Sequence, residues 1–182
     1  MAFNIEAFKN QGLQFGGARS SLFTATIVNP FVSEAANAKI PFQCTSAEIP
    51  ASTLANLVVP YFGREVKVAG NRTYADWTPT IINDEDFVVR NAMETWIHRI
   101  NSPEGNLRDV SATLQSGYKT TATVTQFSKV GAPLREYKFI GIFPTDVSSI
   151  AVDWSTDAIE NFTVTFAYDY WTVSGLTGTG GT

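Results

Sequence analysis

The sequence has almost no cysteine or histidine, with one of each, Cys44 and His98, in 182 residues. A single cysteine excludes a disulfide within the chain, and two soft ligands are too few for a zinc site without carboxylates. Ser–His–Asp catalysis would have His98 as its only base. The sequence has no G-x-S-x-G motif, and its final glycine-rich stretch lacks the lysine of a phosphate-binding loop. We therefore expect no enzyme activity, no metal site and no cofactor.

Charged residues are also scarce, at 16% of the chain, against about 25% in ordinary soluble domains. The formal net charge is −4, which disfavours a protein that grips nucleic acid, because phosphate contacts need clustered lysine and arginine. Low charge has two explanations at this point. The chain has large buried interfaces, or it is a β-rich domain whose surface is covered by threonine and serine.

Long apolar runs are absent as well. No run approaches the 18 residues of a membrane-spanning helix. Glu6 and Lys9 interrupt the apolar residues of the first ten positions, so the continuous core of a signal peptide is missing. We expect a protein made in a cytoplasm, without a membrane anchor.

What the sequence does contain is alternation of apolar and polar residues. Runs of β-branched and aromatic residues, bounded by proline, glycine or asparagine, predict strands. They cover residues 22–28, 39–50, 57–70, 73–82, 119–127, 135–147, 149–154 and 161–171. Pro41, Pro60 and Pro79 fit strand edges or ends, since each removes a backbone donor. The predicted fold class is mainly β, with two packed antiparallel sheets in a sandwich-like or barrel-like arrangement and one flanking helix.

The helix is predicted at about 84–100. Apolar residues recur there at helical spacing, and they are Val89, Met93, Trp96, Ile97 and Ile100. Asn83 is a candidate cap, the acidic triplet 84–86 would lie in the first turn, and His98 with Arg99 would lie in the last, as the helix dipole favours. A helix terminus explains the acidic triplet without a metal or acid–base site.

Two terminal segments differ from the predicted single domain. Residues 1–20 carry apolar residues without a steady period and end in the glycine-rich hinge "FGGARS". They predict an arm, either loosely packed or docked on another subunit. Residues 174–182, "SGLTGTGGT", predict a flexible glycine-rich tail.

The segment 57–77, "LVVPYFGREVKVAGNRTYADW", predicts a hairpin that a partner must cover. Four aromatic residues lie beside three basic ones, with turn residues at Gly63 and Gly70. Tyrosine, tryptophan and arginine are enriched in interface hot spots, and exposed apolar patches mark interaction sites. The candidate subunit-interface residues are Pro60, Tyr61, Phe62, Arg64, Lys67, Arg72, Tyr74 and Trp171.

Two blocks of the sequence are the most distinctive, "VAGNRTYADWTPTIINDE" (68–85) and "DWSTDAIENFTVTFAYDYW" (153–171), and "PFQCTSAEIP" and "FPTDVSSIAVDW" accompany them. In their order and spacing these blocks resemble the tail tube proteins of contractile-tailed bacteriophages. The resemblance covers about residues 12 to 172. It departs from the family at Asn71, where an aspartate is usual in the Gly-x-Arg-Thr turn, and this change keeps the turn chemistry.

The resemblance implies a structural protein of the virion tail, assembled in the cytoplasm of a host bacterium. Such proteins form sixfold rings whose sheets join into one barrel, and the rings stack into a tube inside a contractile sheath. Implied partners are further copies of itself and the sheath, baseplate and tail terminator proteins. DNA and the tape-measure protein pass through the channel without specific binding. The inner tube of a type VI secretion or other contractile injection system is the close alternative, and a monomeric β-sandwich binding module is the distant one.

The stretch 161–171, "NFTVTFAYDYW", is predicted as one long strand with two different faces. Even-numbered residues from Phe162 to Tyr170 form a core face. The opposite face is small and polar, and we expect Thr163, Thr165 and Asp169 to line the channel, with Trp171 at a subunit contact. Small hydroxyls and a carboxylate neither fill a bore nor attract DNA phosphates. Another long strand could line the bore instead.

Overall fold

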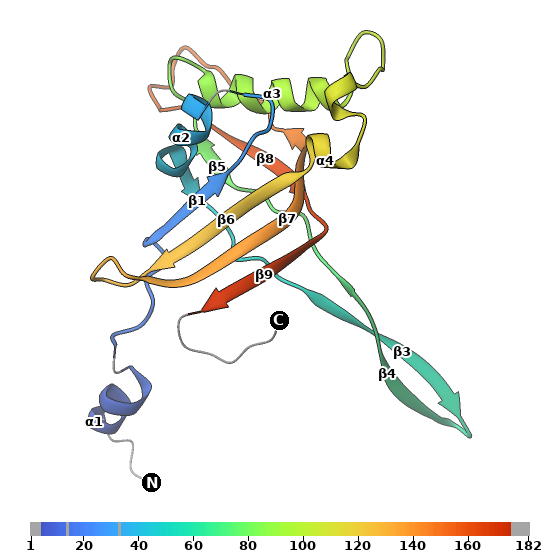
Figure 1. Cartoon of the computed structure of the whole chain (residues 1–182). Coiled ribbons are helices and arrows are strands. Elements are labelled where there is room, and N and C mark those ends of the chain that lie inside the picture. The colour runs from blue at the N-terminus through green and yellow to red at the C-terminus, as the bar shows by residue number, and fades with distance from the viewer. Residues whose placement is uncertain (1–4, 14, 33, 176–182) are drawn as a thin grey trace.

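The computed structural model of the chain describes residues 5–13, 15–32 and 34–175 (Figure 1). The strands are β1 Phe23–Ile27, β2 Cys44–Ser46, β3 Thr53–Tyr61, β4 Arg64–Thr73, β5 Thr80–Ile82, β6 Thr120–Phe127, β7 Pro133–Val147, β8 Asn161–Ala167 and β9 Tyr170–Gly175. The helical segments are α1 Ile5–Ala7, η1 Phe8–Gly12, α2 Glu34–Gln43, α3 Val88–Ile100, η2 Val110–Ala112 and α4 Gln115–Tyr118. None of the helices in these ranges is long and apolar enough to cross a membrane.

One antiparallel sheet builds the body, in the order β1-β6-β7-β8-β5-β2, with β9 also paired to β7. The 15-residue strand β7 holds the sheet together. Its first part pairs with β6 and β9, and its last part pairs with β8. The sheet curls at this strand, so the two packed layers are halves of one sheet (Figure 1). The predicted mainly β, antiparallel, barrel-like class is confirmed.

The core lies inside the curl and is rich in aromatic residues. Trp77 packs against Phe139 with ring centroids 4.7 Å apart and against Phe166 at 5.7 Å. Trp96 closes the cluster from α3, with its ring 6.2 Å from that of Phe166. All four side chains are at most 2% exposed. Their burial supplies the hydrophobic stabilisation of a domain of this size.

The strand β7 changes its inward face at Gly141. Tyr137 and Phe139 are buried before this residue, and Ile142 and Pro144 are buried after it. Gly141 has φ 71, a conformation that glycine adopts without a steric penalty. The pairing of β6 with β7 shifts by one residue at the same place. Gly141 is therefore a bulge that turns the sheet.

The stretch that pairs with β7 on the side of β8 and β9 also exchanges its inward and outward faces, opposite Gly141. This finding corrects the prediction of one uninterrupted strand at 161–171. The stretch divides into β8 and β9 at Tyr168–Asp169. Phe162 and the next two even-numbered residues are buried as predicted, but Tyr170 is 46% exposed. After the break the odd-numbered Trp171 and Val173 pack against the core instead.

Helix α3 is confirmed, although it begins later than predicted. Val89, Met93 and Trp96 are buried, whereas Ile97 and Ile100 are partly buried. The N-cap is Phe87, with φ 52 and no side-chain cap bond. Asn83 does not cap the helix, because the helix begins after Phe87. Its side-chain amide instead donates to Glu160 Oε2 at 2.8 Å.

The acidic triplet 84–86 therefore precedes the helix. Asp84 accepts from Lys39 Nζ at 3.1 Å, and Asp86 accepts from the same amine. The Lys39 hydrogen bond, followed by the Val88 amide, lowers the pKa of the Asp86 carboxyl. Asp84 and Asp86 thus tie the start of α3 to α2 through one lysine.

Three other predicted strands are wrong or shortened. Residues 39–43 end helix α2, where Ala36 and Ile40 are buried one helical turn apart, and only Cys44–Ser46 is extended. Residues 149–154 form no strand. The run at 73–82 contains the last residue of β4, an isolated bridge between Trp77 and Phe166, and β5. Between α3 and β6, residues 101–118 contain the short helices η2 and α4.

The terminal predictions are only partly within the described residues. The N-terminal arm contains α1 and η1, followed by Gly16 and Gly17 at φ 73 and 77. Ser174 and Gly175 end strand β9, and the remainder of the predicted tail, 176–182, lies outside the described residues.

Candidate assembly surfaces

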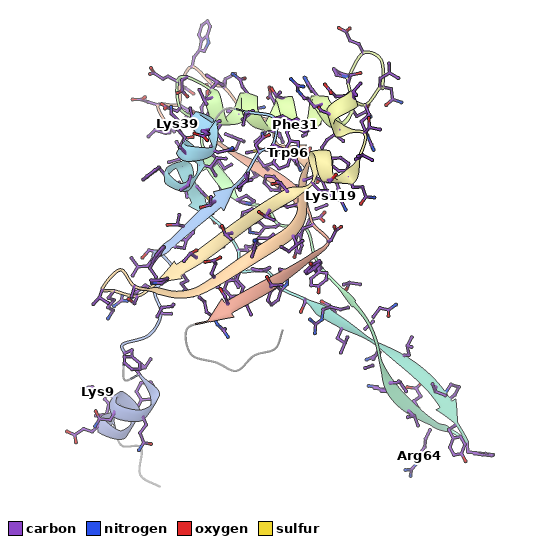
Figure 2. The ribbon with its side chains drawn as sticks, viewed as in Figure 1. Lys9, Phe31, Lys39, Arg64, Trp96 and Lys119 are labelled. Atoms are coloured by element: carbon purple, nitrogen blue, oxygen red, sulfur yellow. The ribbon has the colours of Figure 1, made fainter. Side chains whose placement is uncertain are left out.

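The most prominent surface is the hairpin formed by β3 and β4, which projects away from the curled sheet (Figure 1). Every residue from Thr53 to Thr73 is exposed except Gly70, which is half-buried. At its tip, Phe62 and Gly63 have φ 43 and 81, the left-handed pair that a two-residue hairpin turn requires. Arg64 lies at this tip in Figure 2. A two-stranded hairpin alone is marginally stable in water, so this one is suited to packing against a partner.

The hairpin has one apolar face and one mixed face. Cross-strand pairs place Leu57 opposite Val68 and Val59 opposite Val66, with Tyr61 next along the same face. These five side chains are between 49% and 66% exposed. The other face alternates charged and apolar residues, such as Lys67 opposite Val58. This apolar face is exposed to solvent and has the composition of the core of a protein–protein interface.

Six of the eight predicted interface residues lie on this hairpin. They are Pro60, Tyr61, Phe62, Arg64, Lys67 and Arg72. The apolar stripe itself was missed by sequence reasoning, although the alternation of "LVVPY" and "REVKV" carries it. The aromatic and basic residues predict an interface near the tip of the hairpin, and the aliphatic residues complete its apolar face.

The other two predicted interface residues, Tyr74 and Trp171, make contacts between the base of the hairpin and the curled sheet. The Tyr74 ring lies 5.9 Å from that of Tyr168. Trp171 is half-buried against the core, and its Nε1 donates to the Ala51 carbonyl at 3.3 Å. Both contacts flank the point where the hairpin leaves the sheet.

The predicted channel residues lie in two different places. Thr163 and Thr165 are half-buried on β8, where the Thr163 amide donates to Ser148 Oγ at 2.9 Å. Asp169 lies between β8 and β9, and Lys119 Nζ donates to its Oδ1 at 2.7 Å. The break after Ala167 separates Asp169 from the two threonines.

A wider, threonine-rich polar face covers the outer side of β1, β6, β7 and β9. The register aligns two rows across the four strands, both facing away from the core. One row is Thr24, Thr125, Glu136 and Ser174, and the other is Thr26, Thr123, Lys138 and Thr172. Sequence reasoning missed this face, although "FTATI" and "TTATVTQ" show threonine at every second position.

The single histidine and the single cysteine of the sequence, His98 and Cys44, lie at positions that favour structural roles. In the described ranges no three His, Cys, Asp or Glu residues are grouped as metal ligands. His98 is exposed in the last turn of α3. Cys44 packs against the core, and burial raises the pKa of its thiol to about 11, which keeps it protonated and unreactive. The features that stand out are surfaces for assembly.

Comparison with known proteins agrees with an assembly role. The chain is 34% identical over 132 residues to the tail tube protein gp19 of Enterobacteria phage T4, covering 71% of this chain and 79% of that protein. The tail tube protein gp19 of Enterobacteria phage T6 is 33% identical over the same length and the same shares.

Solved structures share the fold at lower identity. A chain in the tube terminating cap of the anti-feeding prophage superposes with a TM-score of 0.65 at 19% identity, over 87% of this chain and 91% of that one. A chain in the sheath–tube complex of an extracellular contractile injection system, PVC, has a TM-score of 0.58 at 13% identity, over 96% of this chain and 100% of that one.

The family match extends over nearly the whole chain. Residues 8–174 match the family described as phage tail tube protein, a range that includes the curled sheet, the hairpin and both flanking helices α2 and α3. With its fold and its exposed hairpin, the chain belongs to the phage tail tube protein family, whose members are structural components of a virion tail.

Proposed function

We propose that this chain is the repeating subunit of a phage tail tube, closing into sixfold rings that stack around a channel for DNA ejection. The observation that carries the proposal is the uncovered apolar face of the β3–β4 hairpin. A second copy of the chain is its occupant, since stacked identical rings offer each hairpin the same neighbouring surface. Burial of five half-exposed apolar side chains supplies a favourable contribution to each contact.

Two free strand edges support ring closure. Within the described residues, β1 is bonded only to β6, and β9 is bonded only to β7. Unpaired edges promote pairing with another chain. Joining β9 of one subunit to β1 of the next removes both edges, and six subunits with four strands each would form one barrel of 24 strands.

In that barrel the threonine-rich face of β1, β6, β7 and β9 is the channel wall. We assign the wall to this face rather than to Thr163 and Thr165, because β8 lies outside the four-strand unit. Asp169 borders the wall at the start of β9. Glu136 and Lys138 place one charge of each sign on the wall of every subunit, so the wall has no basic cluster that would retain DNA phosphates. At −4 per chain, six chains carry −24 per ring, which weakly repels DNA at short range.

The partners follow from this role. The tube contacts sheath, baseplate and tail terminator proteins, and DNA and the tape-measure protein pass through it without specific binding. The subunit is not an enzyme, and it assembles in the host cytoplasm before becoming part of the virion tail. Residues 5–13 and 15–20 act as an N-terminal arm of a single domain. The alternative is the inner tube of another contractile injection system, a role that the solved structures with this fold favour.

Electron microscopy and native mass spectrometry of the purified chain test the proposal. We expect hollow tubes, and rings of six chains on dilution, near 119 kDa from six masses of 19.9 kDa. A protein that remains a single 19.9 kDa chain at every concentration would instead indicate a monomeric β-sandwich module.

A further inference from the structure

The loop of residues 148–160, which connects β7 to β8, presents a tryptophan to solvent. Trp154 is 107% exposed, with Val152 at 82% and Ile159 at 73%. A fully exposed tryptophan beside two exposed aliphatic residues is unusual on a free surface, and tryptophan is enriched in interface hot spots. The loop lies beyond the end of β7 that is near α3 (Figure 1).

The loop is held in place at both ends and at its tip. The Ser148 amide donates to the Thr163 carbonyl at 2.9 Å, and the Asn83 amide donates to the Glu160 carbonyl at 2.8 Å. At the tip, Asp153 Oδ1 accepts from the Ser155 amide at 2.9 Å and from its hydroxyl at 2.8 Å. These bonds form a turn that carries Trp154. The tryptophan is therefore presented by an ordered turn, which reduces the entropy lost on docking.

An apolar groove of about 680 Å³ lies at the other end of β7. The N-terminal arm and the turn between β6 and β7 form its walls, and Leu13, Phe15, Val130 and Leu134 contribute apolar side chains. Phe15 and Val130 are each 89% exposed. The volume falls within the range that encloses a drug-sized molecule, so it is large enough for an indole ring and one flanking aliphatic side chain.

The charges around the two surfaces are opposite. The groove includes Arg19 and Lys129, and neither takes part in the ion pairs found in the described part of the chain. The loop carries Asp153, Asp157 and Glu160 and no basic residue. Hydrogen bonds from Ser155 lower the pKa of the Asp153 carboxyl. Complementary charge orients an encounter and rejects wrong partners.

We propose that the Trp154 loop of one chain docks in the Arg19–Lys129 groove of a second copy, in the next ring of the stack. The groove contains Leu134 at the start of β7, and the loop begins one residue after its end at Val147. The two surfaces of one chain therefore do not meet, and the contact joins different copies head to tail. Such a heterologous contact does not close on itself but repeats along an axis. The inference rests on the proposed tube function and adds a second contact between stacked rings, besides that of the β3–β4 hairpin.

Cysteine cross-linking of assembled full-length chain tests the contact while keeping Trp154. The variant carries Cys44→Ala, Val130→Cys and Val152→Cys, and mild oxidation should yield a ladder of linked chains on a non-reducing denaturing gel. The matched control replaces Val152→Cys by Phe42→Cys, at a position on α2 that is 88% exposed, and it should remain mostly unlinked. Tubes of ordinary appearance without a ladder in the first variant would overturn the proposal.

Two further variants test the contributions of shape and charge. Trp154→Ala should raise the critical concentration for tube formation about 30-fold, the size of a hot-spot loss, while rings of six persist. Lys129→Glu should also weaken stacking, and adding Asp157→Lys should restore it. A Trp154→Ala chain that assembles like the parent overturns the inference, including the case in which it loses only sheath binding.

The result with the parent chain separates the two levels of inference. A parent chain that forms neither rings nor tubes contradicts the proposed function, and it contradicts the docking contact as well, because that contact requires stacked rings. A parent that forms tubes, with no cross-link and no effect of Trp154→Ala, retains the proposed function and removes only this contact.

Discussion

Lys119 Nζ lies 2.7 Å from Asp169 Oδ1 and 3.0 Å from Oδ2, which places the carboxylate directly over Gly141. A Cβ at Gly141 would lie 2.1 Å from Asp169 Oδ2. This is the corner at which β7 and its partner strands exchange their inward and outward faces. The ion pair joins the start of β6 to the break between β8 and β9 across that corner.

The first prediction concerns the glycine at this corner. Gly141→Ala should destabilise the fold by about 3 kcal/mol, because it adds a steric clash to a left-handed backbone. Gly131→Ala is the control, since Gly131 has φ 81 but nothing within 4 Å of the added methyl. It should cost about 1 kcal/mol. Urea denaturation of both variants measures the difference, and equal midpoints would show that the corner tolerates a side chain.

The second prediction compares two tryptophans. Trp96 is fully buried, and its Nε1 donates to the Tyr118 carbonyl at 3.0 Å, so Trp96→Ala should cost about 3–5 kcal/mol. Trp154→Ala should change the stability of the isolated chain by less than about 0.5 kcal/mol, as expected for an exposed position. Thermal melts of both variants provide the measurement. If Trp96→Ala melts like the parent, the assigned core face of α3 is wrong.

The third prediction concerns the hairpin. Removing residues 51–63 would delete β3 and leave β4 without its partner, so the better change shortens both strands together. Replacing residues 57–68 by a two-residue Asn-Gly turn keeps the paired base near Thr53 and Thr73. We expect a folded, soluble chain with the parent's circular dichroism spectrum that no longer polymerises. Normal tubes from this variant would show that the hairpin is not an assembly element.

The fourth prediction locates the channel wall in assembled tubes. Thr123→Cys lies on the proposed wall and Thr165→Cys lies on β8, each in a Cys44→Ala background. A bulky maleimide that cannot enter the bore should leave Thr123→Cys unlabelled in tubes and label it in dissociated subunits. Protection of Thr165→Cys with ready labelling of Thr123→Cys would assign the wall to the β8 face instead.

The fifth prediction concerns the half-buried thiol of Cys44. Burial raises the pKa of Cys44 to about 11, so at pH 8 only about 0.1% is thiolate, and alkylation of the native chain should be slow. The folded state holds this proton more tightly than the unfolded state, so the thiol's contribution to stability is complete below pH 9 and is lost as pH rises through 11. Alkylation by iodoacetamide with and without urea tests this, and equal rates would contradict it.

The sequence by itself determined the elements whose pattern follows from covalent geometry. Strand alternation located β1, β6 and most of β7, and helical spacing identified the buried face of α3, since periods of 2 and 3.6 residues are local properties of the backbone. Local signals were insufficient at 39–43, where the run 39–50 predicts a strand but the residues end helix α2.

Only the tertiary structure decided how those elements face one another. Odd and even residues exchange sides at Gly141 and at Tyr168–Asp169 because neighbouring strands share one bend, and no single strand carries that information. For the same reason the threonine face became visible only when the register aligned four strands. The tertiary structure likewise decided where the Trp154 loop and the groove lie. The length of β7 separates them and places them at opposite ends of that strand.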